Sequence, residues 1–312
     1  MGLWGSTVMP RWLVSVPVWG ERCIEVFCST CLPALEKAML QLQDVSSIEA
    51  RLVVHTDNHR RIRDGATEIE IENRPVPAGA RDFDSLSEAH RDVLRMACRN
   101  DRVALLTADL LVSKSGLQLC EEILDPPGKN IVMCCGIRAK QEGRLPATDS
   151  AQVMMKWAWE NAHPITQAST YPKGKTTDLS RMYFEENGNV VARLALPHPF
   201  AVKIDGRPMK FSPTVDASLM QNYCASETHV VTETDRLALV ELSPVDKDFQ
   251  EADHSIKIRL DHGGVVMKDP AQRWLAGHRV CLLGDKYKMT IDDTVMREVL
   301  AYDPESVSSR WG

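Results

Sequence analysis

The sequence predicts an α/β protein in which helices flank a mostly parallel central sheet. The first observation is a series of compact apolar runs, rich in β-branched residues and typical of buried strands, at 13–18, 51–57, 102–106 and 130–135. The second is helical spacing of apolar residues between these runs, at 23–42, 85–98 and 115–124. Strand and helix therefore alternate through residue 139, as they do in βαβ units.

Each element in this half is bounded by residues that turn the chain or cap a helix. Residues 19–22 turn the chain after the first strand. Pro33 is expected to kink the helix that follows, because proline lacks the N–H that a helix interior needs. The second strand ends in the polar residues 56–58, and the stretch from there to residue 79 is polar and irregular. Asp84 or Ser85 would cap the next helix.

The second half is less regular and predicts a mixed α+β part. Helices are expected at 151–161, 213–223, near 271–277 and near 292–301. Strands are expected at 190–202, 229–232 and 237–240. The segment 173–177 has the composition of a loop and contains two lysines, Lys173 and Lys175.

Composition narrows the classes of function. The chain has 312 residues, of which 44% are hydrophobic and 26% charged, as in ordinary globular proteins. Its net charge of −6 and its single short basic cluster disfavour nucleic acid as the main partner. The nine cysteines include one C-x-x-C pair, Cys28 and Cys31, which we expect to be reduced and packed in a helix of a cytoplasmic protein. No run is long enough for a transmembrane segment.

Polar residues at the strand ends are the candidates for chemistry, because ligands of open parallel sheets bind beyond the carboxyl ends of strands. Asp109 follows an apolar strand, where its carboxylate would need a divalent cation, a buried hydrogen bond or a capping role. Asp57 either contacts a base or ribose or forms an Asx-turn. Asp216 is either a helix cap or a general base. His198 and His278 lie in well-defined local contexts that favour structural roles.

The order of these segments resembles that of family 2-like glycosyltransferases with a GT-A fold. The matching segments are 14–22 (opening strand and turn), 52–58 (strand ending D-D-G-S or D-D-N-S), 87–91 (A-R-N helix), 105–113 (metal-binding D-x-D) and 200–219 (E-D-x-D-L). The resemblance covers residues 12–245 and is one of order and spacing.

This resemblance implies a GT-A-like (Rossmann-like) fold and transfer of a sugar from a UDP- or GDP-sugar donor to an unidentified acceptor. It implies donor contacts from Pro17, Trp19, Glu21, Thr56, Asp57, Arg91, Thr107 and Ala108. It implies that Asp216 is the catalytic base, and a single base opposite the leaving group favours inversion. From the pattern of elements we expect a nucleotide-binding half over 1–139, an acceptor or catalytic half of the same domain over 140–245, and a C-terminal helical extension over 246–312.

The resemblance implies a divalent cation, Mn²⁺ or Mg²⁺, held by Asp109. Thr107 replaces the first acid of D-x-D, Val215 replaces the acid before Asp216, and Glu241 replaces the closing histidine. Threonine binds a cation poorly, so we expect Glu241 or His278 to supply the missing ligand. Without a metal, Arg91 and the lysines of 173–177 would neutralise the diphosphate.

Two alternatives remain open at this point. Thr107 and Val215 also suit a binding protein that kept the fold and lost turnover. A nucleotidyltransferase on a similar sheet is the other, although residues 18–22 hold one glycine and lack a glycine-rich basic loop. The tryptophans that would stack on a sugar acceptor or pack in the core are Trp157, Trp159 and Trp274.

Overall fold

The computed structural model describes most of the chain: residues 10–65, 68–77, 82–141, 145–171, 181–194, 198–211, 215–245, 274–275 and 278–284. The predicted loop at 173–177 and the predicted helix near 292–301 lie outside these residues. Of the helix predicted near 271–277, only residues 274 and 275 are described, and both are helical.

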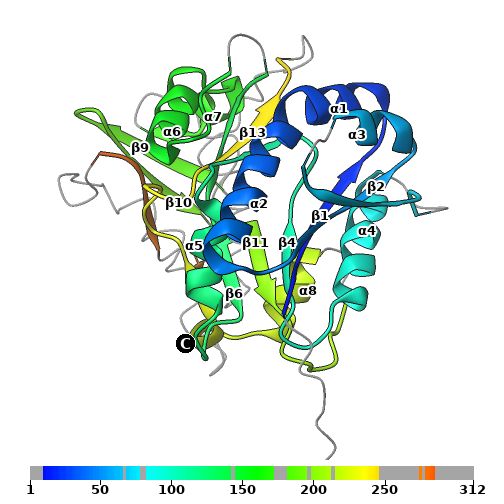
Figure 1. The fold of residues 1–312 in the computed structure, drawn as a ribbon. Coiled ribbons are helices and arrows are strands. Elements are labelled where there is room, and N and C mark those ends of the chain that lie inside the picture. Colours follow the sequence, from blue (N-terminus) through cyan, green and yellow to red (C-terminus); the bar gives the residue numbers. More distant parts are fainter. Residues whose placement is uncertain are drawn as a thin grey trace, which may run out of the picture.

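A seven-stranded sheet forms the centre of the molecule, in the order β12-β6-β11-β4-β1-β2-β3 (Figure 1). Its strands are β1 (Trp12–Val18), β2 (Ala50–Thr56), β3 (Glu70–Arg74), β4 (Arg102–Leu105), β6 (Ile131–Cys134), β11 (His198–Lys203) and β12 (Thr228–Val230). All neighbouring pairs are parallel except those of β11, which runs antiparallel to both β4 and β6. The predicted α/β class with a mostly parallel sheet is therefore confirmed.

Strand β1 lies inside the sheet because every residue of Trp12–Val18 is apolar or small enough to be buried. Its alternating side chains face opposite layers of helices. Trp12 points to one layer, where its indole Nε1 donates to Glu121 of α5 (Gly116–Leu124) at 2.7 Å. Ser15 points to the other layer and lies 2.8 Å from Nδ1 of His90 on α4 (Asp82–Met96).

Helices cover both faces of this sheet (Figure 1). On the α5 side lie α1 (Glu21–Val26), a π-helical turn (Phe27–Cys31) and α2 (Leu32–Ser46), which packs on α5. On the α4 side lies α8 (Val215–Asn222), which packs on α4 and β11. Among the described residues, no helix combines the length and apolar character needed to cross a bilayer.

The π-helical turn is where Pro33 acts on the first helix. Pro33 has no N–H for a bond to Ser29 four residues earlier, and a wider turn just before it relieves that mismatch. The turn carries Cys28 and Cys31, which pack as predicted, and all nine cysteines are free thiols.

Two smaller sheets extend the second half. One has the order β5-β13-β7, with β5 (Leu110–Val112), β13 (Leu239–Ser243) and β7 (Gly136–Lys140). The other has the order β14-β10-β9-β8, with β14 (Arg279–Leu283), β10 (Asn189–Leu194), β9 (Arg181–Glu186) and β8 (Thr170–Tyr171). The helices α6 (Ala151–Glu160) and α7 (Pro164–Ala168) pack against β7. A 3-10 turn, Ala225–Glu227, leads into β12.

Three sequence-based expectations are wrong. Helix α4 begins at Asp82, so Asp84 and Ser85 lie inside the helix and do not cap it. The stretch before residue 79 is not irregular throughout, because α3 (His59–Gly65) and β3 lie in it. The single strand expected over 190–202 is two strands, β10 and β11, in different sheets. The strand β14 was also not expected, because it lies in the segment predicted as a helical extension over 246–312; it pairs with β10 and ties residues 279–283 to the second half.

Candidate functional site

The candidate site lies at one edge of the central sheet, where β2, β1 and β4 end side by side. Val18 pairs with Thr56, and Ser15 pairs with Leu105. Neighbouring strands lie about 4.8 Å apart, so the residues that follow these three strands meet along a short edge. The structure thus brings together three of the sequence-predicted segments: 17–21, 56–58 and 107–109.

The turn after β1 is fixed by the backbone conformation of Gly20 and by an ion pair of Glu21. Pro17 is buried and Trp19 half-buried, and Gly20 has φ 79°, a backbone conformation that a side chain would strain. Glu21 begins α1, and its carboxylate pairs with the Arg61 guanidinium on α3. This ion pair ties the segment after β1 to the segment after β2.

The end of β2 forms a tight polar turn. Thr56 is buried, and its hydroxyl accepts a hydrogen bond from the Asn58 backbone N–H at 3.1 Å. The Asn58 side chain in turn accepts from the Arg61 N–H at 3.2 Å and caps α3. Asp57 lies between them and is exposed, so its carboxylate is accessible to a ligand. The Asx-turn role proposed for Asp57 falls to its neighbour Asn58.

The segment after β4 carries a desolvated acid. Ala108 is buried, and the Thr107 hydroxyl donates to Oδ1 of Asp109 at 2.6 Å. Burial raises the pKa of Asp109 above its ordinary value, and the nearby Glu241 carboxylate adds to the rise. The Thr107 hydrogen bond and the Arg138 guanidinium act in the opposite direction. The pKa of the Cys23 thiol on α1 is also raised, mainly by burial and secondly by the negative charge of Asp109 nearby.

An ion pair that sequence analysis did not find completes this edge. Glu241 on β13 lies opposite Arg138 on the parallel strand β7, and their side chains pair. The backbone carbonyl of Asp109 accepts from the N–H of Leu242 at 2.8 Å, which brings Asp109 next to Glu241. The sequence offered only a weak signal for Arg138, a polar position between apolar ones in a short strand.

His278 lies in a different environment from Asp109. Its Nδ1 is 3.0 Å from the Trp274 carbonyl oxygen, and its ring meets the Trp274 ring edge-on, with 4.5 Å between the ring centroids. Across the part of the chain that the structure describes, no three His, Cys, Asp or Glu side chains gather as metal ligands. Asp109 and His278 therefore do not share a three-ligand site there.

Arg91 is a mostly buried residue of α4, and it donates to Glu88 one turn earlier at 2.8 Å. Its neighbours on the helix face the sheet: His90 meets Ser15, and the Asp92 carboxylate lies 3.1 Å from Nε2 of His55. Burial lowers the pKa of His55, although the Asp92 carboxylate opposes that effect. Arg91 thus belongs to the packing of α4, beside a histidine and a carboxylate that contact β1 and β2.

Asp216 is the second residue of α8. Contacts at the end of this helix show which edge of the central sheet the helix runs toward. Just past the end of the helix, the Tyr223 hydroxyl donates to the Lys203 carbonyl at 3.3 Å. Lys203 pairs with Arg102 at the start of β4, so α8 ends at the amino edge of the sheet. The first turn of α8 lies about 9 Å away along the helix, in the direction of the carboxyl edge.

The three tryptophans pack against the core rather than standing free. Trp157 and Trp159 are half-buried on α6, and the Trp159 ring lies 6.0 Å from the Tyr183 ring. Trp274 is half-buried against the core and against His278. For His198 the backbone is described, and it begins β11 opposite Cys134.

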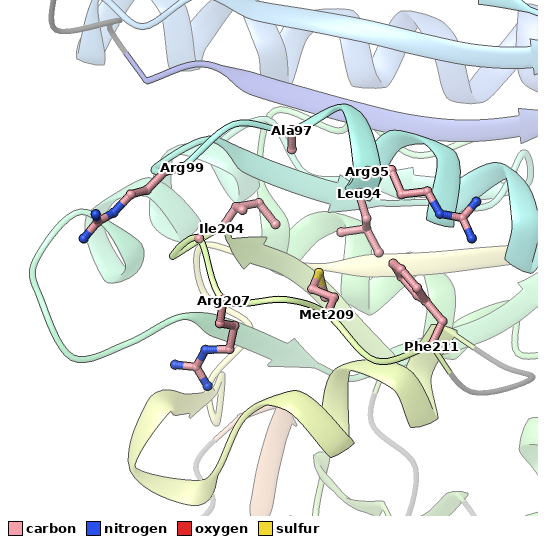
Figure 2. A pocket seen from close by; sticks show the side chains of 9 residues that line it. Leu94, Arg95, Ala97, Arg99, Ile204, Arg207, Met209 and Phe211 are labelled. Atoms are coloured by element: carbon pink, nitrogen blue, oxygen red, sulfur yellow. The ribbon is translucent and has the colours of Figure 1, made fainter. Parts of the chain in front are cut away.

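A pocket of about 240 Å³ lies at the opposite edge of the sheet from the candidate site (Figure 2). Figure 2 shows a mixed lining, with the apolar side chains of Leu94, Ile204, Met209 and Phe211 beside three arginines, Arg95, Arg99 and Arg207. Because Ile204 follows the end of β11, this pocket lies beyond the amino ends of the parallel strands. It does not coincide with the edge at which Asp109 lies.

The strand order and the flanking helices define an α/β protein with one large, mostly parallel sheet. No protein-family model and no curated protein matches the sequence. Among solved structures, the chain is similar in fold to three crystal structures of S. aureus TarS. TarS 1–349 has a TM-score of 0.42 and 13% identity, covering 94% of this chain and 71% of that chain. The structure of TarS has a TM-score of 0.40 and 10% sequence identity, and the match covers 85% of this chain and 42% of that chain. The structure of TarS 1–349 in complex with UDP-GlcNAc has a TM-score of 0.38 and 12% sequence identity, and the match covers 85% of this chain and 70% of that chain.

Proposed function

We propose that the protein transfers a sugar from a nucleotide-sugar donor, of the UDP- or GDP-sugar class, to an acceptor hydroxyl. The observation that carries this proposal is the meeting of segments 17–21, 56–58 and 107–109 at one sheet edge. These are the segments whose resemblance to family 2-like glycosyltransferases implies donor contacts. The exposed Asp57 would accept hydrogen bonds from the base or ribose, while the Asp109 region would face the diphosphate.

In this reaction the bond between the anomeric carbon and the diphosphate oxygen breaks, and its electron pair leaves with the nucleoside diphosphate. The acceptor oxygen forms the new bond to the anomeric carbon, and its proton passes to a carboxylate base. We assign that base to Asp216, in the first turn of α8. Attack from the side opposite the leaving group inverts the configuration. The departing diphosphate gathers negative charge, which needs a positive partner in the site.

A second candidate is a binding protein that holds the nucleotide sugar without turnover. The observation in its favour is that Thr107 stands where an acid is expected and hydrogen-bonds Asp109. Both candidates predict nucleotide binding at the same edge, and only the first predicts release of nucleoside diphosphate.

The decisive experiment is incubation of the full chain with a panel of nucleotide sugars, with and without manganese, followed by measurement of released nucleoside diphosphate. Release that depends on an added acceptor and is lost in Asp216→Asn supports the transferase. Binding of a nucleotide sugar without release in any combination supports the binding protein. Absence of binding to every nucleotide tested contradicts both candidates.

A further inference from the structure

The ion pair between Arg138 and Glu241 lies where the proposed reaction needs positive charge. The two residues are register partners on β7 and β13, and their side chains are 28% and 21% exposed. Arg138 acts electrostatically on Asp109 by lowering its pKa, and Glu241 acts on it by raising its pKa. Two carboxylates and one guanidinium therefore form a single charge cluster at the carboxyl edge of the sheet.

These side chains do not fit a divalent cation well. A cation bound together with substrate phosphates commonly takes one or two protein carboxylates. Here Oδ1 of Asp109 already accepts from the Thr107 hydroxyl, and Glu241 already pairs with Arg138. A cation shared by Asp109 and Glu241 would have to displace the guanidinium. Within the described residues there is also no third His, Cys, Asp or Glu ligand beside them.

We propose that Arg138, in place of a divalent cation, binds the diphosphate of the donor and neutralises it as it departs. This inference rests on the proposed function. A guanidinium has five N–H donors in a planar fork that matches phosphate oxygens. Glu241 engages one Nη, and Nε of Arg138 is buried and has no hydrogen-bond partner within the described part of the chain. The carboxylate of Glu241 holds the guanidinium in position, and a preorganised charge is the kind that stabilises a leaving group best.

The test is calorimetric titration of the full chain with UDP and with GDP, in EDTA and in manganese. The expected result is equal affinity in both buffers for the nucleotide that binds. Arg138→Gln should weaken that affinity about tenfold or more, because it removes charge-assisted hydrogen bonds. The same variant should bind the corresponding nucleoside, which lacks phosphates, as wild type does. Arg51→Gln is the matched control, since Arg51 is also a strand arginine in carboxylate ion pairs and is 26% exposed.

A second variant separates the arginine from a metal site and guards against misfolding. Glu241→Gln removes the carboxylate that positions Arg138 but keeps the positive charge, so it should weaken nucleotide binding less than Arg138→Gln does, and equally in EDTA and in manganese; loss of a metal ligand would weaken binding in manganese only. If Arg138→Gln does not fold, the neutral double variant Arg138→Gln/Glu241→Gln replaces it and should show the same loss.

Nucleotide binding that requires manganese, or that survives Arg138→Gln or the double variant, overturns the role of Arg138 and leaves the proposed function standing. Failure of wild type to bind any nucleoside diphosphate overturns both.

Discussion

The Thr107 hydroxyl and the Asp109 carboxylate form a hydrogen bond of 2.6 Å at the end of β4. This bond partly offsets the burial of an acid that also faces the negative charge of Glu241. The residue that replaces an expected acid thus keeps its neighbour ionised at lower pH than burial alone would allow. Thr107 and Asp109 are therefore a coupled pair.

Asp109→Asn should stabilise the protein at neutral pH. The pKa of Asp109 in the folded state is raised above the ordinary 3.8. At a pH above this raised pKa, ionisation of Asp109 lowers the free energy of unfolding. At a pH below the pKa of the unfolded state, Asp109 is protonated in both states and this loss disappears. The gain in melting temperature should therefore shrink as pH falls toward about 4. A gain of about 1 kcal/mol would correspond to about 2–4 °C. Thr107→Val, which removes the compensating donor, should act in the opposite direction. A pH-independent difference between Asp109→Asn and wild type would contradict this account.

Asp57→Ala should weaken nucleotide binding without harming the fold. Its carboxylate is exposed at the end of β2, so few packing contacts are lost. Losing hydrogen bonds to a charged group should reduce affinity about tenfold or more, measured by calorimetry. Asp64→Ala is the matched control, because Asp64 is an exposed carboxylate on the neighbouring helix α3. Equal losses in the two variants would remove Asp57 from the donor site.

Asp216→Asn should bind the donor normally and turn over at least about a hundredfold more slowly, because a general base acts mainly in the transition state. Asparagine caps a helix nearly as well as aspartate, so the melting temperature should not change. Donor affinity, melting temperature and turnover are measured on the same sample. Full activity would leave inversion without its base and favour the helix-cap role.

A buried charge network far from the site should dominate stability. Arg102 donates to Glu121 at 2.8 Å, Trp12 donates to the other oxygen of Glu121 at 2.7 Å, and both charged side chains are less than one-tenth exposed. Arg102→Met should cost about 3–5 kcal/mol in urea unfolding, since it leaves a buried carboxylate without its counter-charge. Arg236→Ala, which breaks the exposed pair with Glu122, should cost about 1 kcal/mol or less. Comparable losses would indicate that water reaches Glu121.

The apolar runs predicted the central strands well, because β1, β2 and β4 are buried on both faces and leave an unbroken pattern. The edge strand β3 (Glu70–Arg74) escaped prediction because it is polar. Arg51 pairs with Glu70 and Glu72 of β3, and Arg74 pairs with Asp92 of α4, and such pairing partners are invisible to local patterns.

The site was predictable only where it follows strand ends. Thr56, Asp57, Thr107 and Asp109 were found because parallel strands bring their carboxyl ends together. Arg138 was not found, since its role depends on the pairing of β7 with β13, two strands separated by about a hundred residues. His278 shows the converse: its local context was distinctive, but its Nδ1 contacts the backbone carbonyl of Trp274, four residues earlier in the same segment.

The pairing of β14 with β10 has a consequence for folding during synthesis of the chain. Val190 meets Leu283, so one edge of β10 stays open until ribosomal synthesis has passed residue 283. An unpaired strand edge is a template for association with other chains. Nascent or truncated chains that lack β14 would therefore be prone to aggregate, and β14 acts as a built-in protective strand during biogenesis.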